Sequence, residues 1–146
     1  MGDRLTFLNI PVSDLDRSKA FYGALGFAFD PKFTDQSCAC MVISSQSYVM
    51  LLEQDRFAEF CAKPAADVAA TTGALICVSA DDRAGVDTFA EAALAAGGSP
   101  AKEATDMGFM YGRSFFDPDG HHWEVMWMDP AAVEQGPNDY AAAQHA

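Results

Sequence analysis

The sequence predicts an α+β fold made of two βαβββ modules, and three observations lead to this prediction. The stretch IPVSDLDRS at residues 10–18 returns as ICVSADDRA at residues 76–84, with Ile, Val, Ser, Asp and Arg matching. Each copy leads into a segment with the period of an amphipathic helix. Three segments with the two-residue period of strands then follow each helix.

The two helices are expected over residues 14–24 and 82–96. Both repeats carry a serine in a position typical of a helix N-cap. Gly26 ends the first helix and Gly97 the second, because glycine readily adopts the left-handed conformation found at helix ends.

The strand candidates of the first half are FAFDPKF, CACMVIS and YVMLLE, and those of the second half are SPAKEA, MYGRSFF and HHWEVMW. The sequence DPDG at residues 117–120 is typical of a turn between the last two strands. A short helix is expected around Arg56–Cys61, between the halves.

These elements predict one domain over residues 1–130, with modules at about 5–53 and 73–128 that residues 54–72 join. The tail, residues 131–146, has little apolar periodicity, which favours a mobile end or a partner-docking arm. Each module offers one sheet with one apolar face. The two modules are therefore expected to pair as a curled mixed sheet around a cleft, within one chain or between two chains.

The composition is that of a globular protein: half of the 146 residues are hydrophobic and 21% are charged. Nine basic residues against 21 acidic ones give a formal net charge of −12, which argues against nucleic acid or an anionic membrane as a partner. No apolar run approaches the roughly 18 residues of a membrane span, and the start MGDRLTF has no signal-peptide features. A cytoplasmic location is therefore expected.

Four cysteines occur, and none forms a CxxC motif. Cys38 and Cys40 lie two residues apart on an expected strand, so they share a face. In a reducing compartment such cysteines favour a role as small buried hydrophobes, with metal binding or redox chemistry as the alternative.

Two motifs resemble those of the vicinal oxygen chelate superfamily, which includes glyoxalase I, bleomycin-resistance proteins and extradiol dioxygenases. They are IPVSDLDRSKAFYGALGF near the start and SFFDPDGHHWEVMW near the end. The resemblance covers residues 5–128 and implies a glyoxalase-like fold. The fold carries several chemistries and some non-catalytic binders, so the reaction does not follow from it.

In the metal enzymes of this superfamily, ligands come from the first and last strands of each module. The resemblance implies Glu53 and Glu124 as the last-strand ligands and catalytic residues, because both acids end apolar segments. At the first-strand positions stand Phe7 and Gly73, whose side chains cannot coordinate a metal. His122 shares a face with Glu124 and could act as a third ligand. A divalent metal (Zn, Ni, Mn or Fe) or no cofactor at all both remain open.

Other residues are candidates for the cleft. Arg113 lies on the strand before Glu124, where it could pair with that carboxylate or form a salt bridge at the rim. The candidates for substrate binding are Phe7, Asn9, Tyr48, Tyr111 and Arg113.

Two functions are in competition. The first is a bleomycin-resistance-like protein that binds a small molecule in the inter-module cleft, with a degenerate or absent metal site. The alternative is a divalent-metal-dependent lyase or isomerase of the lactoylglutathione-lyase type that uses Glu53 and Glu124. An extradiol dioxygenase is disfavoured, because it needs two histidines and one glutamate around iron. The resemblance also implies a homodimer.

Overall fold

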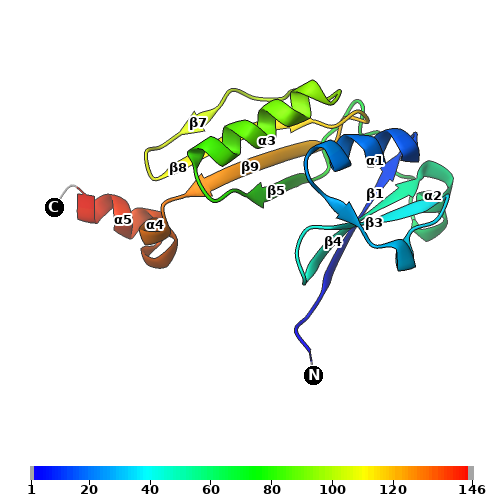
Figure 1. The fold of residues 1–146 in the computed structure, drawn as a ribbon, viewed down its shortest axis with the longest axis horizontal. Coiled ribbons are helices and arrows are strands. Elements are labelled where there is room, and N and C mark those ends of the chain that lie inside the picture. Colours follow the sequence, from blue (N-terminus) through cyan, green and yellow to red (C-terminus); the bar gives the residue numbers. More distant parts are fainter. Residues whose placement is uncertain (1, 145–146) are drawn as a thin grey trace.

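The computed structural model describes residues 2–144 and confirms the two βαβββ modules (Figure 1). The first module consists of β1 (Thr6–Val12), α1 (Leu15–Ala24), β2 (Ala28–Phe29), β3 (Cys38–Val42) and β4 (Ser47–Glu53), with the 3₁₀ turn η1 (Pro31–Phe33) after β2. The second consists of β5 (Leu75–Ser79), α3 (Arg83–Ala95), β6 (Ser99–Pro100), β8 (Met110–Phe116) and β9 (His122–Met128), with the short strand β7 (Thr105–Asp106) before β8. Helix α2 (Gln54–Phe60) begins the connection between the modules.

The two sheets repeat one topology. The strand orders are β1-β4-β3-β2 and β5-β9-β8-β6, with β7 also paired to β8. The first strand of each module lies parallel to the last, whereas the remaining pairs are antiparallel. Within the described chain, β1 and β5 are the edge strands at which the two sheets approach each other.

Two predicted strands are much shorter than expected. FAFDPKF gives only the two residues of β2, because Pro31 begins η1 and the side chain of Asp30 caps that turn through the N–H of Lys32. In SPAKEA, only Ser99 and Pro100 pair with β8.

The helix caps also differ from the prediction. Asp14, and not the serine before it, caps α1 by accepting a hydrogen bond from the N–H of Arg17 at 3.1 Å. Asp82 caps α3 in the same way through Gly85, at 2.6 Å. The repeated serine of the first module, Ser13, instead donates its hydroxyl to Asp119 at 2.6 Å.

The helices α1 and α3 cover one face of the sheets, and a core that both modules share lies beneath them. Strand residues of alternate positions point into this core. Its buried members include Ile10, Val12, Phe21, Tyr22, Leu51, Phe115 and Trp123. The face that carries no helix is called the open face below.

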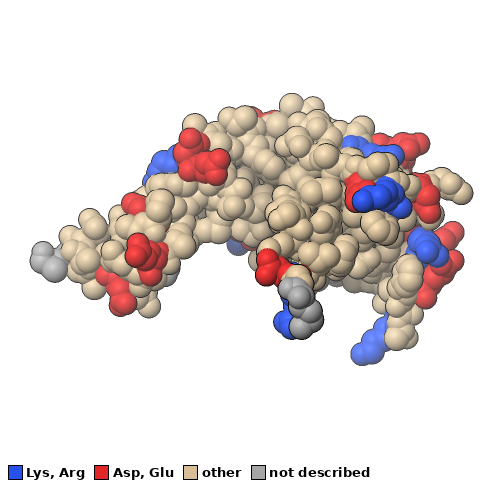
Figure 2. All heavy atoms as spheres, turned by 60° about the horizontal axis from the view of Figure 1, so that its bottom comes forward, with Lys and Arg blue, Asp and Glu red and all other residues tan. Residues whose placement is uncertain are grey.

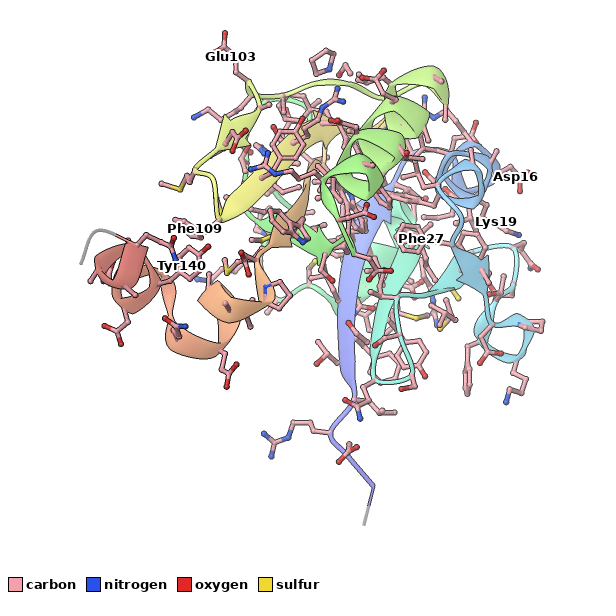
Figure 3. All side chains as sticks on the ribbon, turned by 60° about the vertical axis from the view of Figure 1, so that its left-hand side comes forward. Asp16, Lys19, Phe27, Glu103, Phe109 and Tyr140 are labelled. Atoms are coloured by element: carbon pink, nitrogen blue, oxygen red, sulfur yellow. The ribbon has the colours of Figure 1, made fainter. Side chains whose placement is uncertain are left out.

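The tail is helical where the structure describes it. Helices α4 (Pro130–Gln135) and α5 (Pro137–Gln144) extend away from the modules (Figure 1). Phe109 and Tyr140 connect this arm to the body, with ring centroids 5.9 Å apart (Figure 3). Within residues 2–144, no helix combines the length and the apolar character that crossing a membrane requires.

Candidate functional site

Three of the predicted ligand-binding residues lie together on the open face of the first sheet. Phe7 and Tyr48 are register partners, and their rings stack with centroids 5.1 Å apart. Asn9 follows on the same face of β1. Phe7 is 52% exposed, so this aromatic pair is available to a ligand or to a second protein surface.

Glu53 lies on the opposite, helix-covered face. Its partner in β1 is Val12, which is fully buried in the core, and paired residues of adjacent strands point to the same side of a sheet. The Oε1 atom of Glu53 accepts a hydrogen bond from the N–H of Leu15, at 3.3 Å. This carboxylate thus interacts with the N-terminus of α1, where a negative charge is stabilising.

Glu124 lies on the open face. Its neighbours Trp123 and Val125 are fully buried on the helix side, so the alternation of the strand turns Glu124 the other way. Its register partners are Cys77 on β5 and Ser114 on β8. Burial and then the charge of Glu124 raise the pKa of the Cys77 thiol. The carboxylate itself is half-buried, in a strand whose other face is the apolar one.

The strand register does not make Glu53 and Glu124 equivalent positions of the repeat. Pairing matches Val12 with Glu53 in the first sheet and Val78 with Val125 in the second. Since the repeat equates Val12 with Val78, the counterpart of Glu53 is Val125. A shift of one residue along a strand changes the face of the side chain. Glu53 and Glu124 consequently do not converge.

His122 shares the open face with Glu124, as predicted from the alternation. Its ring lies against Phe116, with centroids 5.4 Å apart. His121 has a different environment: it is 8% exposed, and its Nε2 lies 2.7 Å from the carbonyl oxygen of Pro11 in the other module.

These residues do not fit a divalent metal. Among residues 2–144, no three His, Cys, Asp or Glu side chains lie close enough to hold an ion. Glu53 faces away, and Phe7 offers no donor atom. Gly73 lies two residues before β5 begins. His122 and Glu124 alone leave a divalent ion short of the three protein ligands typical of a catalytic zinc site.

Tyr111 and Arg113 are also not where the sequence suggested. The pairing of β8 and β9 sets Ser114 opposite Glu124 and Arg113 opposite the buried Val125. Arg113 therefore lies on the helix side, where it pairs with Asp87 at 3.2 Å and Glu91 at 2.8 Å. The hydroxyl of Tyr111 donates to Asp87 at 2.6 Å. Arg113 therefore forms a salt bridge, the alternative to a pair with Glu124, and its partners are carboxylates of α3.

A cavity of about 150 Å³ lies where the two modules meet. It runs between the edge strands β1 and β5, and most of its surface is apolar. Leu8, Ile10 and Ile76 supply apolar wall from the strands, and Asn9 and His122 supply polar groups.

The inter-module connection forms part of the wall of this cavity, a role that the sequence did not reveal. Val68 and residues 71–74 form part of its wall. Val68 lies directly on the DPDG turn: a Cβ on Gly120 would come within 2.7 Å of the Val68 carbonyl oxygen, and Gly120 has a φ of +102°. This glycine was the only sequence signal for the contact.

Comparisons with known proteins agree with the fold. Residues 4–44 match the family model described as bleomycin resistance protein-like N-terminal. No curated protein matches the chain.

Among solved structures, the chain is similar to the hypothetical protein SA1046 from S. aureus, with 28% identity, a TM-score of 0.73, and coverage of 87% of this chain and 94% of that one. It is also similar to a glyoxalase/bleomycin resistance protein/dioxygenase family enzyme from Burkholderia phytofirmans PsJN, with 18% identity, a TM-score of 0.71, and coverage of 86% and 99%. The lactoylglutathione lyase from Agrobacterium tumefaciens shows 21% identity, a TM-score of 0.64, and coverage of 87% and 95%.

Proposed function

We propose that this chain, by its fold a member of the vicinal oxygen chelate superfamily, binds a small and largely apolar molecule in the cavity between its two modules. The observation that carries the proposal is the cavity itself, which has apolar walls from both modules and a further wall from the connection between them. Small-molecule sites are typically apolar pockets with a few polar groups that fix the orientation of the ligand.

Asn9 and His122 are the polar contacts that we assign to this ligand. Both side chains line the cavity, and they come from different modules. An amide and an imidazole can each donate and accept hydrogen bonds, so a ligand with one or two oxygen or nitrogen atoms would suit them. A cavity of about 150 Å³ fits a ligand of the size of a single aromatic ring.

The lyase alternative loses its main support. It requires Glu53 and Glu124 to act on one substrate, and Glu53 interacts with the N-terminus of α1 on the other face. The similarity to a lactoylglutathione lyase, at 21% identity, concerns the fold. Glu124 remains a candidate for contact with a ligand on the open face.

The binding proposal is tested with benzene and indole as probes. Gly73 lines the cavity, and a Cβ there would meet no atom within 4 Å, so Gly73→Leu is expected to fill the space without backbone strain. Gly23→Leu, on the surface of α1, is the matched control, because a Cβ there also meets nothing within 4 Å.

Each probe is expected to raise the melting temperature of the wild-type protein and of Gly23→Leu, because a ligand that binds only the folded state stabilises it. The rise should disappear in Gly73→Leu. An equal rise in all three proteins, or in none, would refute the cavity as the binding site. A metal analysis of protein purified without chelator completes the test: one equivalent of Zn, Ni, Mn or Fe that is lost in Glu124→Ala would instead favour the lyase.

We also propose a homodimer. Apolar side chains are exposed at the open face and at the edge strands, among them Phe7 at 52% and Leu75 at 59%. Much of the surface in Figure 2 consists of uncharged residues. Light scattering should give about 31 kDa, twice the chain mass of 15.7 kDa, and a species of 15.7 kDa alone would contradict the dimer.

A further inference from the structure

Three sulfur-containing side chains lie on the open face of the first sheet. Cys38 and Cys40 lie on β3, and the alternation of that strand turns both side chains to the open face, because Ala39 and Met41 are fully buried in the core. Met50 on β4 is the register partner of Cys40. Directly paired residues of antiparallel strands have Cβ atoms about 5 Å apart.

Two of these three residues border a hollow. Cys40 and Met50 line a pocket of about 310 Å³ together with Phe7, Asn9 and Phe33. Phe33, from η1, is 63% exposed, whereas Cys40 is 2% exposed. The sulfur of Cys40 thus lies at the base of an apolar pocket with an aromatic side chain at its margin.

From this arrangement we propose that Cys38, Cys40 and Met50 form a binding site for a soft monovalent cation, Cu(I), on the open face of the first sheet. Thiolate and thioether sulfur are the donors that select Cu(I). Zn²⁺ fits poorly, because structural zinc takes four ligands, and within residues 2–144 no group of three His, Cys, Asp or Glu residues could supply most of them.

The spacing of the two thiols favours an ion over a disulfide bond. Residues two apart on a strand have Cα atoms about 6.7 Å apart. This lies at the upper limit for a disulfide, whose Cα atoms are usually about 5.5–6 Å apart. An ion between two sulfurs separates them by two metal–sulfur bonds, which for zinc are about 2.3 Å each, instead of by one S–S bond of about 2 Å, so it suits the wider spacing better. Both cysteines are free thiols.

Binding replaces the thiol protons. One Cu(I) ion and two thiols give a bis-thiolate complex and two released protons, with no change of oxidation state. Burial and then the charge of Asp35 raise the pKa of Cys38, which Arg56 lowers. Burial, Asp30 and Cys38 raise the pKa of Cys40. Both thiols are therefore protonated near neutral pH, and each one used as a ligand must give up its proton.

The test is capture of Cu(I) from the coloured Cu(I)–bicinchoninate complex, without oxygen. The site variant is Cys38→Ala/Cys40→Ala. The matched control is Cys61→Ala/Cys77→Ala, which removes the two thiols outside the site. A third variant, Met50→Leu, removes the thioether but keeps the size of the side chain.

The wild-type protein and the control are expected to remove one equivalent of Cu(I) and to release about two protons per ion in weakly buffered solution. The site variant should remove none, and Met50→Leu should compete less well than the wild type. Circular dichroism checks that each variant is folded; where the double variant is not, Cys38→Ser alone is measured. Capture of one equivalent by the site variant, or its loss in the control, would overturn the proposal, as would a release of no protons.

Discussion

Tyr22 and Asp117 form the most consequential polar contact at the scale of single residues. The Tyr22 hydroxyl donates to Asp117 Oδ2 at 2.5 Å, in a buried position between the modules. Asp117 Oδ1 accepts the backbone N–H groups of Asp119, Gly120 and His121, at 2.8–3.0 Å. The aspartate of the DPDG turn therefore both shapes the turn and anchors it to α1.

Removing the tyrosine hydroxyl should destabilise the protein. For Tyr22→Phe we expect a loss of about 1.5–3 kcal/mol of unfolding free energy, the usual contribution of a hydrogen bond to a charged group. Tyr140→Phe is the control, because its hydroxyl bonds Asp129 at 3.1 Å on the more exposed arm, and it should cost about 1 kcal/mol or less. Urea denaturation measures both. Equal losses in the two variants would mean that the hydrogen bond to Asp117 stabilises the fold no more than the hydrogen bond to Asp129.

The same aspartate should leave a signature in the pH dependence of stability. Burial raises the pKa of Asp117, although Tyr22 and His121 oppose this. Between the pKa of the unfolded chain, about 3.9, and the higher pKa of the folded protein, the folded state holds more protons. Its stability relative to Asp117→Asn should therefore fall as the pH rises through this interval and be constant above it. Urea titrations of both proteins at several pH values test this. A wild-type stability that rises with pH relative to that of Asp117→Asn would contradict the prediction.

At the scale of elements, the contact between the inter-module connection and the β8–β9 turn depends on one glycine. Gly120 has a φ of +102°, and an added Cβ would lie 2.7 Å from the Val68 carbonyl oxygen. Gly108 has a φ of +82°, but a Cβ there would meet no atom within 4 Å. A side chain at either position would be strained by the left-handed backbone, and only at Gly120 would it also collide with a neighbouring atom.

Alanine substitutions should separate these two effects. Gly108→Ala is expected to cost about 1–2 kcal/mol of unfolding free energy from the left-handed backbone alone. Gly120→Ala should cost about 1–3 kcal/mol more, because the connection must move. Since that connection walls the cavity, Gly120→Ala should also weaken benzene binding while Gly108→Ala does not. Equal stability and equal benzene binding in the two variants would show that the backbone at Val68 can move aside at no measurable cost.

The elements also show how far the sequence could predict the site. Alternation in HHWEVMW placed His122 and Glu124 correctly on one face. It could not place Glu53, because the end of an apolar run does not define the pairing register, and an error of one residue reverses the face. Arg113 was misplaced for a different reason: it lies one residue beyond Ser114, the partner of Glu124, and the alternation of the strand turns it to the other face.

For the whole molecule, the repeat and the turn signals were sufficient for the topology, since both follow from local pattern. A cleft between the modules was expected from the sequence, but the part of its wall that the connection supplies was not, because that connection has no regular period. The division into a domain over residues 1–130 and a tail over residues 131–146 remains a prediction. The helical arm contacts the body through Phe109 and Tyr140, which neither confirms nor contradicts that boundary.

The two modules should unfold as one unit, because their core is continuous. Phe21 in α1 contacts Phe115 of the second module, with ring centroids 6.2 Å apart. Phe27, on the inner side of the first module in Figure 3, lies 5.8 Å from Phe89 and 6.3 Å from Trp123. Neither module can bury these aromatic surfaces alone.

A substitution in the first module should therefore also destabilise the second module. Phe21→Ala is expected to lower the unfolding free energy by about 3–5 kcal/mol, the usual cost of deleting a buried phenylalanine, since Phe21 is 2% exposed. Tryptophan fluorescence reports on the surroundings of β9, where both tryptophans lie, while far-ultraviolet circular dichroism reports on the whole chain. In urea the two signals should shift together to the same lower midpoint. A fluorescence midpoint that stays at the wild-type value would show instead that the second module is stable independently of the first.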